Sequence, residues 1–204
     1  ALRTWTPTPL NRPPCLQKPK PRLIFAKSKT WPSMQSSIPK DAEEEMMRLE
    51  LRLQLLAAHE KATSHFLDFC KYVWPEMLVG EHHRIIAKAL DRVVSGDCKR
   101  LMIAMPPRHG KSQMGSYLFP AYIMGRKPDA KLIVGSHTAD LAQRFGRMIR
   151  NLVDDEKYKE LFPGMTLSVD SKAAGRWNTA QGGEAFFIGK GGAMTGRGGN
   201  IVIL

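Results

Sequence analysis

The fold prediction starts from MPPRHGKS at residues 105–112, which lies between an apolar segment at 101–105 and a helix-forming segment at 111–124. Gly110 lets the backbone approach a ligand closely, and the N–H groups at the start of a helix can bind phosphate oxygens. Lys111 would bridge the terminal phosphates of a nucleotide, and the Ser112 hydroxyl would ligate magnesium. The stretch predicts a phosphate-binding turn, and this interpretation depends on a strand that leads into it.

The turn matches the nucleotide-binding pattern G-x-x-x-x-G-K-[ST] only in its second half, because Met105 stands in the place of the first glycine. A Gly-Lys-Ser triplet alone is common, so an ordinary strand-to-helix turn is the alternative. An apolar strand before the turn and an apolar helix after it favour phosphate binding.

Short apolar runs alternate with helical periodicity after residue 100. Strands are expected at 101–105, 132–135, 165–169, 185–188 and 201–204, and helices at 111–124, with a bend at Pro120, and at 138–153. This alternation is typical of an α/β fold with a mostly parallel sheet and helices on both faces. We expect a P-loop nucleoside triphosphatase domain over residues 81–204, incomplete at its C-terminus.

Residues 41–80 are expected to form a helical lead-in to that domain. Asp41 opens a helix that runs towards residue 70, with an apolar face of residues 46, 49, 53 and 56. Trp74 and Pro75 then end the helical pattern. A second helix is predicted at 81–95, where Gly96 stops it.

Residues 1–40 form a proline-rich, basic tail. They contain eight of the 14 prolines, eight of the 31 basic residues and none of the 19 acidic ones, so they carry +8 of the net charge of +12. Such composition cannot form a packed core and predicts disorder. The remainder is only mildly basic, so charge gives weak support for a nucleic-acid partner. The first methionine is Met34, and we interpret residues 1–33 as not native to the protein.

Two classes of protein are disfavoured by composition. The three cysteines are widely spaced without a C-x-x-C pair, which argues against a disulfide scaffold or a zinc site. No apolar run approaches the roughly 18 residues that a membrane-spanning helix requires.

Several blocks of the sequence resemble the large terminase subunit of tailed bacteriophages. Residues 105–112 resemble the variant Walker A motif of that family, including the missing first glycine. The likeness continues through GSHTADLAQRFGR at 135–147, RWNT at 176–179, the glycine pair at 182–183 and GGAMTGRGGN at 191–200. It covers about residues 65–204.

The resemblance implies an ATPase motor that translocates double-stranded viral DNA into a procapsid, with ATP and Mg²⁺ as cofactors. It also implies a small terminase subunit and the portal protein of the procapsid as partners, a homo-oligomeric ring, and no membrane. The expected location is the host-cell cytoplasm, with transient docking on the procapsid. In this family a separate nuclease domain cuts the DNA.

When the family's residue roles are transferred to matching positions of this sequence, the second half of the turn is expected to bind ATP and Ser112 to bind magnesium. Lys111 and Arg108 would be the catalytic residues, with Arg108 neutralising charge on the γ-phosphate. Pairing of Arg108 with a nearby carboxylate is the alternative. The ATP-binding residues are Pro107, Arg108, His109, Gly110, Lys111 and Ser112.

In the family, acidic residues that hold magnesium and activate water follow the last apolar run, whereas this sequence stops at Leu204. We therefore expect these 204 residues alone to bind nucleotide poorly and to hydrolyse it negligibly.

Two other functions remain open from the sequence. The chain could be a helicase-like or another P-loop ATPase, or a non-catalytic fragment that binds nucleic acid. His82 and His83 could contact a nucleotide or simply cap the helix that they begin. The role of Arg197, in a glycine-rich segment, is open between phosphate, DNA and a neighbouring subunit.

Overall fold

The computed structural model describes residues 40–192 and 196–204, apart from the side chains of residues 40 and 169–172. The prediction of a disordered tail at 1–40, and of a non-native segment within it, lies outside the described residues. None of the described helices is both long and apolar enough to cross a membrane.

Three helices precede the phosphate-loop sequence. They are α1 (Lys40–Ser64), α2 (Phe66–Val73) and α3 (Glu81–Ser95). The predicted boundaries of α3 are confirmed, and Gly96 ends it with a left-handed φ of 89°. The helix predicted from Asp41 to residue 70 is instead divided at His65. The predicted apolar face of α1 does not pack in the described part of the chain, because Met46, Leu49, Leu53 and Leu56 are each more than half exposed.

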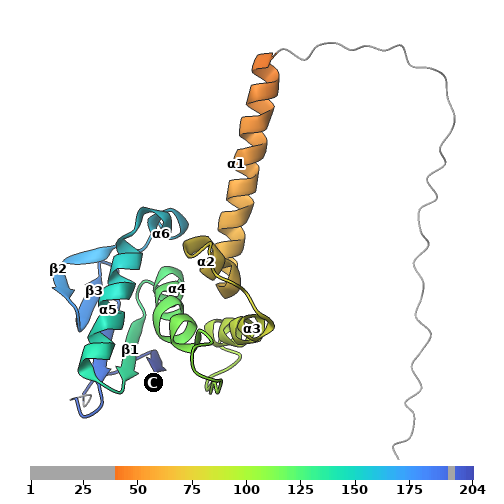
Figure 1. Ribbon diagram of the computed structural model, residues 1–204. Helices are drawn as coiled ribbons and strands as arrows, with labels where there is room; N and C mark the ends of the chain where they lie inside the picture. Colours follow the sequence, from red (N-terminus) through yellow and green to blue (C-terminus); the bar gives the residue numbers. More distant parts are fainter. Residues whose placement is uncertain (1–39, 193–195) are drawn as a thin grey trace, which may run out of the picture. The chain divides into compact units, whose positions relative to one another are not determined.

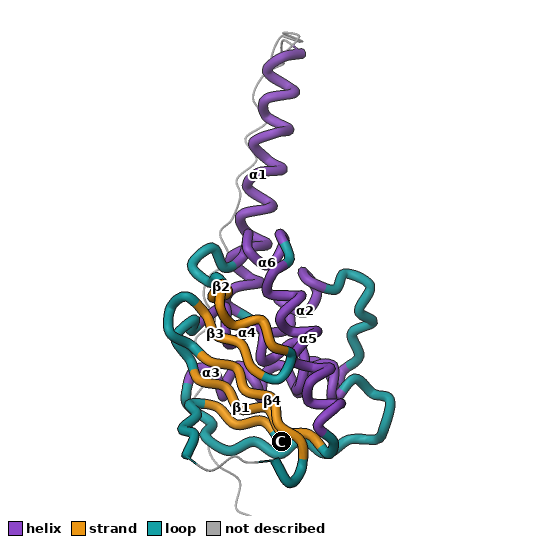
Figure 2. The backbone as a smooth tube through the Cα atoms, turned by 90° about the vertical axis from the view of Figure 1, so that its left-hand side faces the viewer, coloured by secondary structure: helices purple, strands orange, loops and turns teal. Residues whose placement is uncertain are grey.

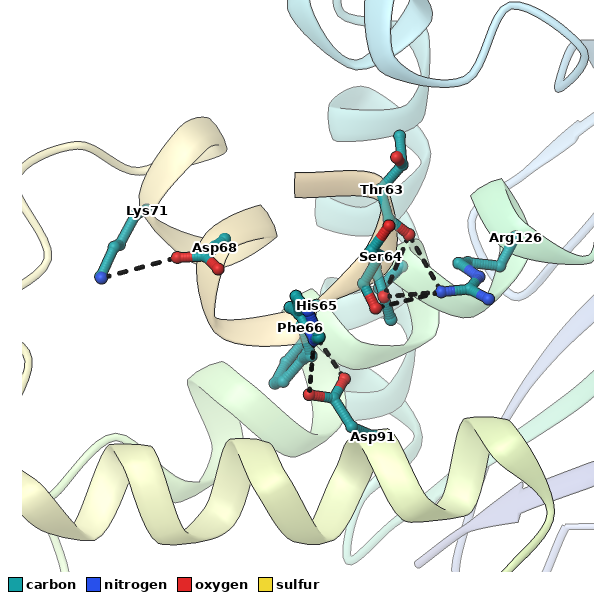
Figure 3. Close-up of polar contacts among 9 residues, drawn as sticks. Thr63, Ser64, His65, Phe66, Asp68, Lys71, Asp91 and Arg126 are labelled. Atoms are coloured by element: carbon teal, nitrogen blue, oxygen red, sulfur yellow. Dashed lines mark hydrogen bonds and ion pairs between the residues drawn. The ribbon is translucent and has the colours of Figure 1, made fainter. Parts of the chain in front are cut away.

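Side chains from other helices bind the backbone where α1 and α2 meet (Figure 3). The N–H of Phe66, at the start of α2, donates to the Asp91 carboxylate of α3 at 2.9 Å. The Arg126 guanidinium donates to the carbonyl oxygens of Thr63 and Ser64, at the end of α1, at 3.0 and 3.2 Å. A carboxylate interacts favourably with the positive N-terminal end of a helix dipole, and a cation with the negative C-terminal end. Tertiary contacts therefore stabilise the division of the two helices.

The predicted helix after the turn forms, and it is locally widened. Helical structure begins at Lys111, passes through a π-helical segment, η1 (Gln113–Leu118), and continues as α4 (Phe119–Arg126). The Phe119 N–H donates to the Met114 carbonyl, five residues back. Pro120 has no N–H and its ring would press on the preceding helical turn. The wider π turn immediately before Pro120 accommodates the ring without ending the helix.

Five strands form one mixed sheet in the order β2-β3-β4-β1-β5. Their bounds are β1 (Lys131–Ser136), β2 (Leu167–Ala173), β3 (Arg176–Thr179), β4 (Glu184–Gly189) and β5 (Ile201–Ile203), and between β1 and β2 lie α5 (Ala139–Asp154) and α6 (Glu156–Leu161). β1 pairs in parallel with β4 and β5, whereas β2–β3 and β3–β4 are antiparallel.

The predicted fold class, a mostly parallel P-loop sheet with helices on both faces, is therefore wrong. Only residues 174–175 separate β2 from β3, and only residues 180–183 separate β3 from β4. A parallel connection needs a dozen residues or more, so these strands must reverse direction. The sequence prediction missed β3 altogether, because four residues between two turns give little periodicity.

The helices lie on one face of the sheet, as Figures 1 and 2 show. The chain from β1 to β2 carries α5, which packs on this face. The connection from β4 to β5 contains no helix in its described part, so none of the described helices covers the other face there.

The core lies between the helices and the covered face of the sheet. Alternate residues of the strands point into it, including Leu132 and Val134 of β1 and Phe187 of β4. Trp177, from the strand that the sequence analysis missed, is fully buried, and its indole N–H donates to the carbonyl of Gly146 in α5.

Candidate phosphate-binding site

The backbone of the predicted turn passes through the left-handed region at two residues. Arg108 and Gly110 both have positive φ, 64° and 80°. The first helical hydrogen bond after the turn runs from the Met114 N–H to the Gly110 carbonyl, at 2.9 Å. The N–H groups of residues 111–113 therefore lie in the first turn of a helix, where no helical acceptor exists for them. Such N–H groups are the ordinary ligands of a bound phosphate.

The strand predicted at 101–105 is absent: these residues have no strand structure, and Met102 is almost fully exposed. A strand needs a neighbouring strand for its backbone hydrogen bonds, and no described strand lies beside this segment. The nearest candidate, β5, has only three residues and pairs only with β1. The condition set for the interpretation, a strand that leads into the turn, is therefore not met, and the fold gives the motor interpretation no support. What remains is the geometry of the turn, the helix and the adjoining cleft.

Lys111 and Ser112 line a cleft of about 950 Å³. The cleft is also lined by residues 135–137 at the carboxyl end of β1, by residues 127, 129 and 130 before its amino end, and by residues 200–204. In sheets with parallel strands, ligands bind in the crevice outside the carboxyl ends of those strands. Lys99 and Lys127 also line the cleft, although no motif in the sequence marks them. Lys111 and Ser112 are thus exposed to a space large enough for a nucleotide.

The other predicted site residues lie outside the lining of this cleft. Pro107, Arg108 and His109 are exposed, and His109 Nδ1 lies 2.8 Å from the Pro107 carbonyl oxygen. Within residues 40–192 and 196–204 no carboxylate pairs with Arg108, so the alternative role as a structural ion-pair partner has no support there. Only Lys111 and Ser112, of the six predicted residues, share the cleft.

The donor set fits a magnesium ion only if a phosphate supplies further ligands. The described residues contain no group of three His, Cys, Asp or Glu side chains that could hold a metal. Mg²⁺ is commonly held by one or two protein oxygens together with phosphate oxygens and water. The exposed Ser112 hydroxyl, in the first helical turn and facing the cleft, meets that requirement.

Arg197 is held against the uncovered face of the sheet and does not line the cleft. Its guanidinium lies 4.1 Å from the centroid of the Phe186 ring and donates to Glu184 Oε1 at 2.7 Å. The Arg176 Nε binds the same carboxylate oxygen at 2.8 Å. Within the described chain, Arg197 contacts its own sheet.

Comparisons of the chain with protein-family models, curated proteins and solved structures found no match. Function has therefore to be argued from the site.

Proposed function

We propose that the turn at 105–112 binds the phosphates of ATP, and that the chain is the ATP-binding part of a viral DNA-packaging motor. The observation that carries the proposal is the placement of Lys111 and Ser112. Both follow a turn with two positive φ angles, both lie in the first turn of a helix, and both line a cleft that extends along β5 and past both ends of β1.

Each residue has a definite chemical task in this proposal. The N–H groups of the first helical turn bind phosphate oxygens, and the Lys111 ammonium neutralises the terminal phosphates. The Ser112 hydroxyl helps to hold Mg²⁺, which when bound neutralises charge on the phosphates. Arg108, which has no carboxylate partner among the described residues, is available to stabilise charge on the γ-phosphate.

The assignment to a motor is supported by the resemblance to the large terminase subunit across residues 65–204. It extends the proposal from phosphate binding to ATP hydrolysis coupled to translocation of double-stranded DNA. The proposed partners are viral DNA, the small terminase subunit and the portal protein, with a ring of identical subunits. The mixed sheet adds no support to this part.

The first test is binding of a fluorescent ATP analogue to the purified chain with Mg²⁺ present. We predict that Lys111→Ala weakens binding by at least about tenfold, because a charge-assisted contact to the terminal phosphates is lost. Lys99→Ala is the matched control, since it removes a lysine from the same cleft but outside the turn. Equal losses in the two variants, or no loss in Lys111→Ala, would contradict the proposal.

The same preparation separates the alternative functions. Binding of double-stranded DNA is measured by fluorescence anisotropy at two salt concentrations, because phosphate contacts make DNA affinity salt-dependent. A chain that binds DNA but no ATP analogue fits the non-catalytic alternative. A chain that binds the ATP analogue and prefers single-stranded to double-stranded DNA fits a helicase.

A further inference from the structure

The first turn of α3 lies against the phosphate turn, although His83 and Gly110 are 27 positions apart in the sequence. A Cβ atom added to Gly110 would lie 3.0 Å from His83 Nε2. The rings of His82 and His109 meet edge to face, with their centroids 5.8 Å apart. The two histidines that begin α3 therefore contact the segment that presents Lys111 and Ser112.

The hydrogen bonds of His83 determine which ring nitrogen carries its proton. The Gly80 N–H donates to His83 Nδ1 at 3.0 Å, so Nδ1 is an acceptor and is unprotonated. A neutral imidazole then carries its proton on Nε2, which lies 3.1 Å from His82 Nε2. Partial burial lowers the pKa of His83, and the neighbouring His82 lowers it further, while a hydrogen bond to the His109 backbone raises it. At neutral pH the ring is uncharged, and its Nε2 lies close both to His82 Nε2 and to Gly110.

Gly110 is needed at this contact for two reasons. Its φ of 80° is one that residues with a side chain rarely adopt. In addition, any side chain at this position would press on the His83 ring. His83 thus packs against the residue immediately before Lys111.

We propose that His83 is a positioning residue for the phosphate turn. Its Nδ1 fixes the ring to the Gly80 backbone, and its Nε2 side holds the backbone of residues 109 and 110 so that the N–H groups of Lys111 and Ser112 face the phosphates. The inference rests on the proposed ATP binding and adds a residue that lies outside the motif.

Two substitutions separate positioning from simple capping of α3. His83→Asn places an amide oxygen near the position of Nδ1, which keeps the bond to Gly80 but cannot reach the turn. His83→Gln places an amide N–H near the position of Nε2, which reaches the turn but leaves the Gly80 N–H without its acceptor. The melting temperature of each variant reports capping, and its affinity for a fluorescent ATP analogue with Mg²⁺ reports positioning.

We expect His83→Asn to keep the melting temperature of the wild type and to bind the ATP analogue about tenfold more weakly, a loss equivalent to one hydrogen bond. His83→Gln should bind it within about twofold of wild type. Wild-type affinity in His83→Asn, with binding lost in Lys111→Ala, would overturn the inference and leave the proposed function intact. No binding by the wild type would overturn both.

A second measurement needs no variant. Nitrogen-15 NMR of the wild-type chain reports the tautomer of each histidine, and His83 should be neutral with its proton on Nε2 at neutral pH. A proton on Nδ1 would mean that the bridge from Gly80 to the turn does not form, which would overturn the inference independently of any loss of folding.

Discussion

At the scale of single residues, the most informative one is Arg108. A side chain in the left-handed region costs about 1–2 kcal/mol, and the structure keeps Arg108 there in an exposed turn with φ of 64°. Such strain is concentrated at functional sites, where the surrounding structure enforces it. Among residues 40–192 and 196–204, no carboxylate forms a compensating ion pair with Arg108. This combination fits a residue that is held for a ligand.

Replacement of Arg108 by glycine should therefore stabilise the chain. The strain is removed, while the greater freedom of glycine in the unfolded chain offsets part of the gain, which leaves about 0.5–1 kcal/mol. Urea denaturation of Arg108→Gly measures this gain. Arg108→Ala, which keeps a side chain at positive φ, is the control and should be no more stable than the wild type. If Arg108→Gly is no more stable than Arg108→Ala, the positive φ of Arg108 does not strain the folded chain.

At the scale of elements, the start of α2 depends on α3. The residue before α2, His65, provides no capping hydrogen bond through its side chain, and Asp91 supplies the acceptor from a different helix. Burial raises the pKa of Asp91, and the hydrogen bond from Phe66 and the charges of His65 and Arg126 oppose that rise without reversing it. The carboxyl group is therefore easier to protonate in the folded chain than in the unfolded chain.

This direction has a defined consequence for stability against pH. The stabilisation that comes from protonating Asp91 is fully present below its unfolded pKa of about 3.8 and is lost as the pH rises through the raised folded pKa. Asp91→Asn keeps an acceptor without a charge to desolvate, so at pH 7 it should match or exceed the stability of the wild type. As the pH falls towards about 4, the free energy of unfolding of the wild type should rise relative to that of Asp91→Asn. Asp91→Ala should lose about 1 kcal/mol at pH 7, as for a lost helix cap.

Urea denaturation of the three proteins at neutral and acidic pH tests this prediction. An Ala variant as stable as the wild type would show that Asp91 does not cap α2. If Asp91→Asn instead becomes more stable relative to the wild type on acidification, the pKa of Asp91 is lowered by its partners and not raised by burial.

At the scale of the whole molecule, one hydrophobic cluster joins the helices to the covered face of the sheet, and Cys70 lies inside it. Burial, and secondarily the nearby Asp91, raises the pKa of its thiol. Cys98 is only half-buried, and its thiol lies 3.3 Å from the carbonyl oxygen of Arg100. Reaction with a disulfide reagent requires that the reagent reach the sulfur and that the sulfur be a thiolate. Labelling of Cys98 should therefore report on the native chain, and labelling of Cys70 on its unfolding.

In a Cys15→Ser background, which leaves only these two cysteines, Cys98 should react rapidly in the native chain and Cys70 only as the chain unfolds. The rate at Cys70 should rise with urea concentration in parallel with the unfolded population. Thiol labelling followed by peptide mass spectrometry measures both rates. Rapid labelling of both cysteines without urea would show that the cluster opens locally and is not a single cooperative core.

The uncovered face and the free edge of the sheet are also properties of the whole molecule. β5 lies at the edge of the sheet, Val202 is half-exposed and Leu204 almost fully so. The apolar strand predicted at 201–204 forms as β5, but the sequence does not show which strand lies next to it. The same limit explains the error at 101–105, where an apolar run was interpreted as a strand although no neighbour pairs with it.

Local patterns in the sequence determined the elements that are governed by local chemistry. They include α3 with its stop at Gly96, α5, the core of β1 and of β4, and the bent turn before Lys111, because periodicity and glycine act over a few residues. Only the tertiary structure decided the mixed pairing of the strands, the single covered face, the capping of α2 by Asp91 and the contact of His83 with Gly110. Each of these joins residues that are distant in the sequence, and their pairing is fixed by which surfaces meet when the chain packs.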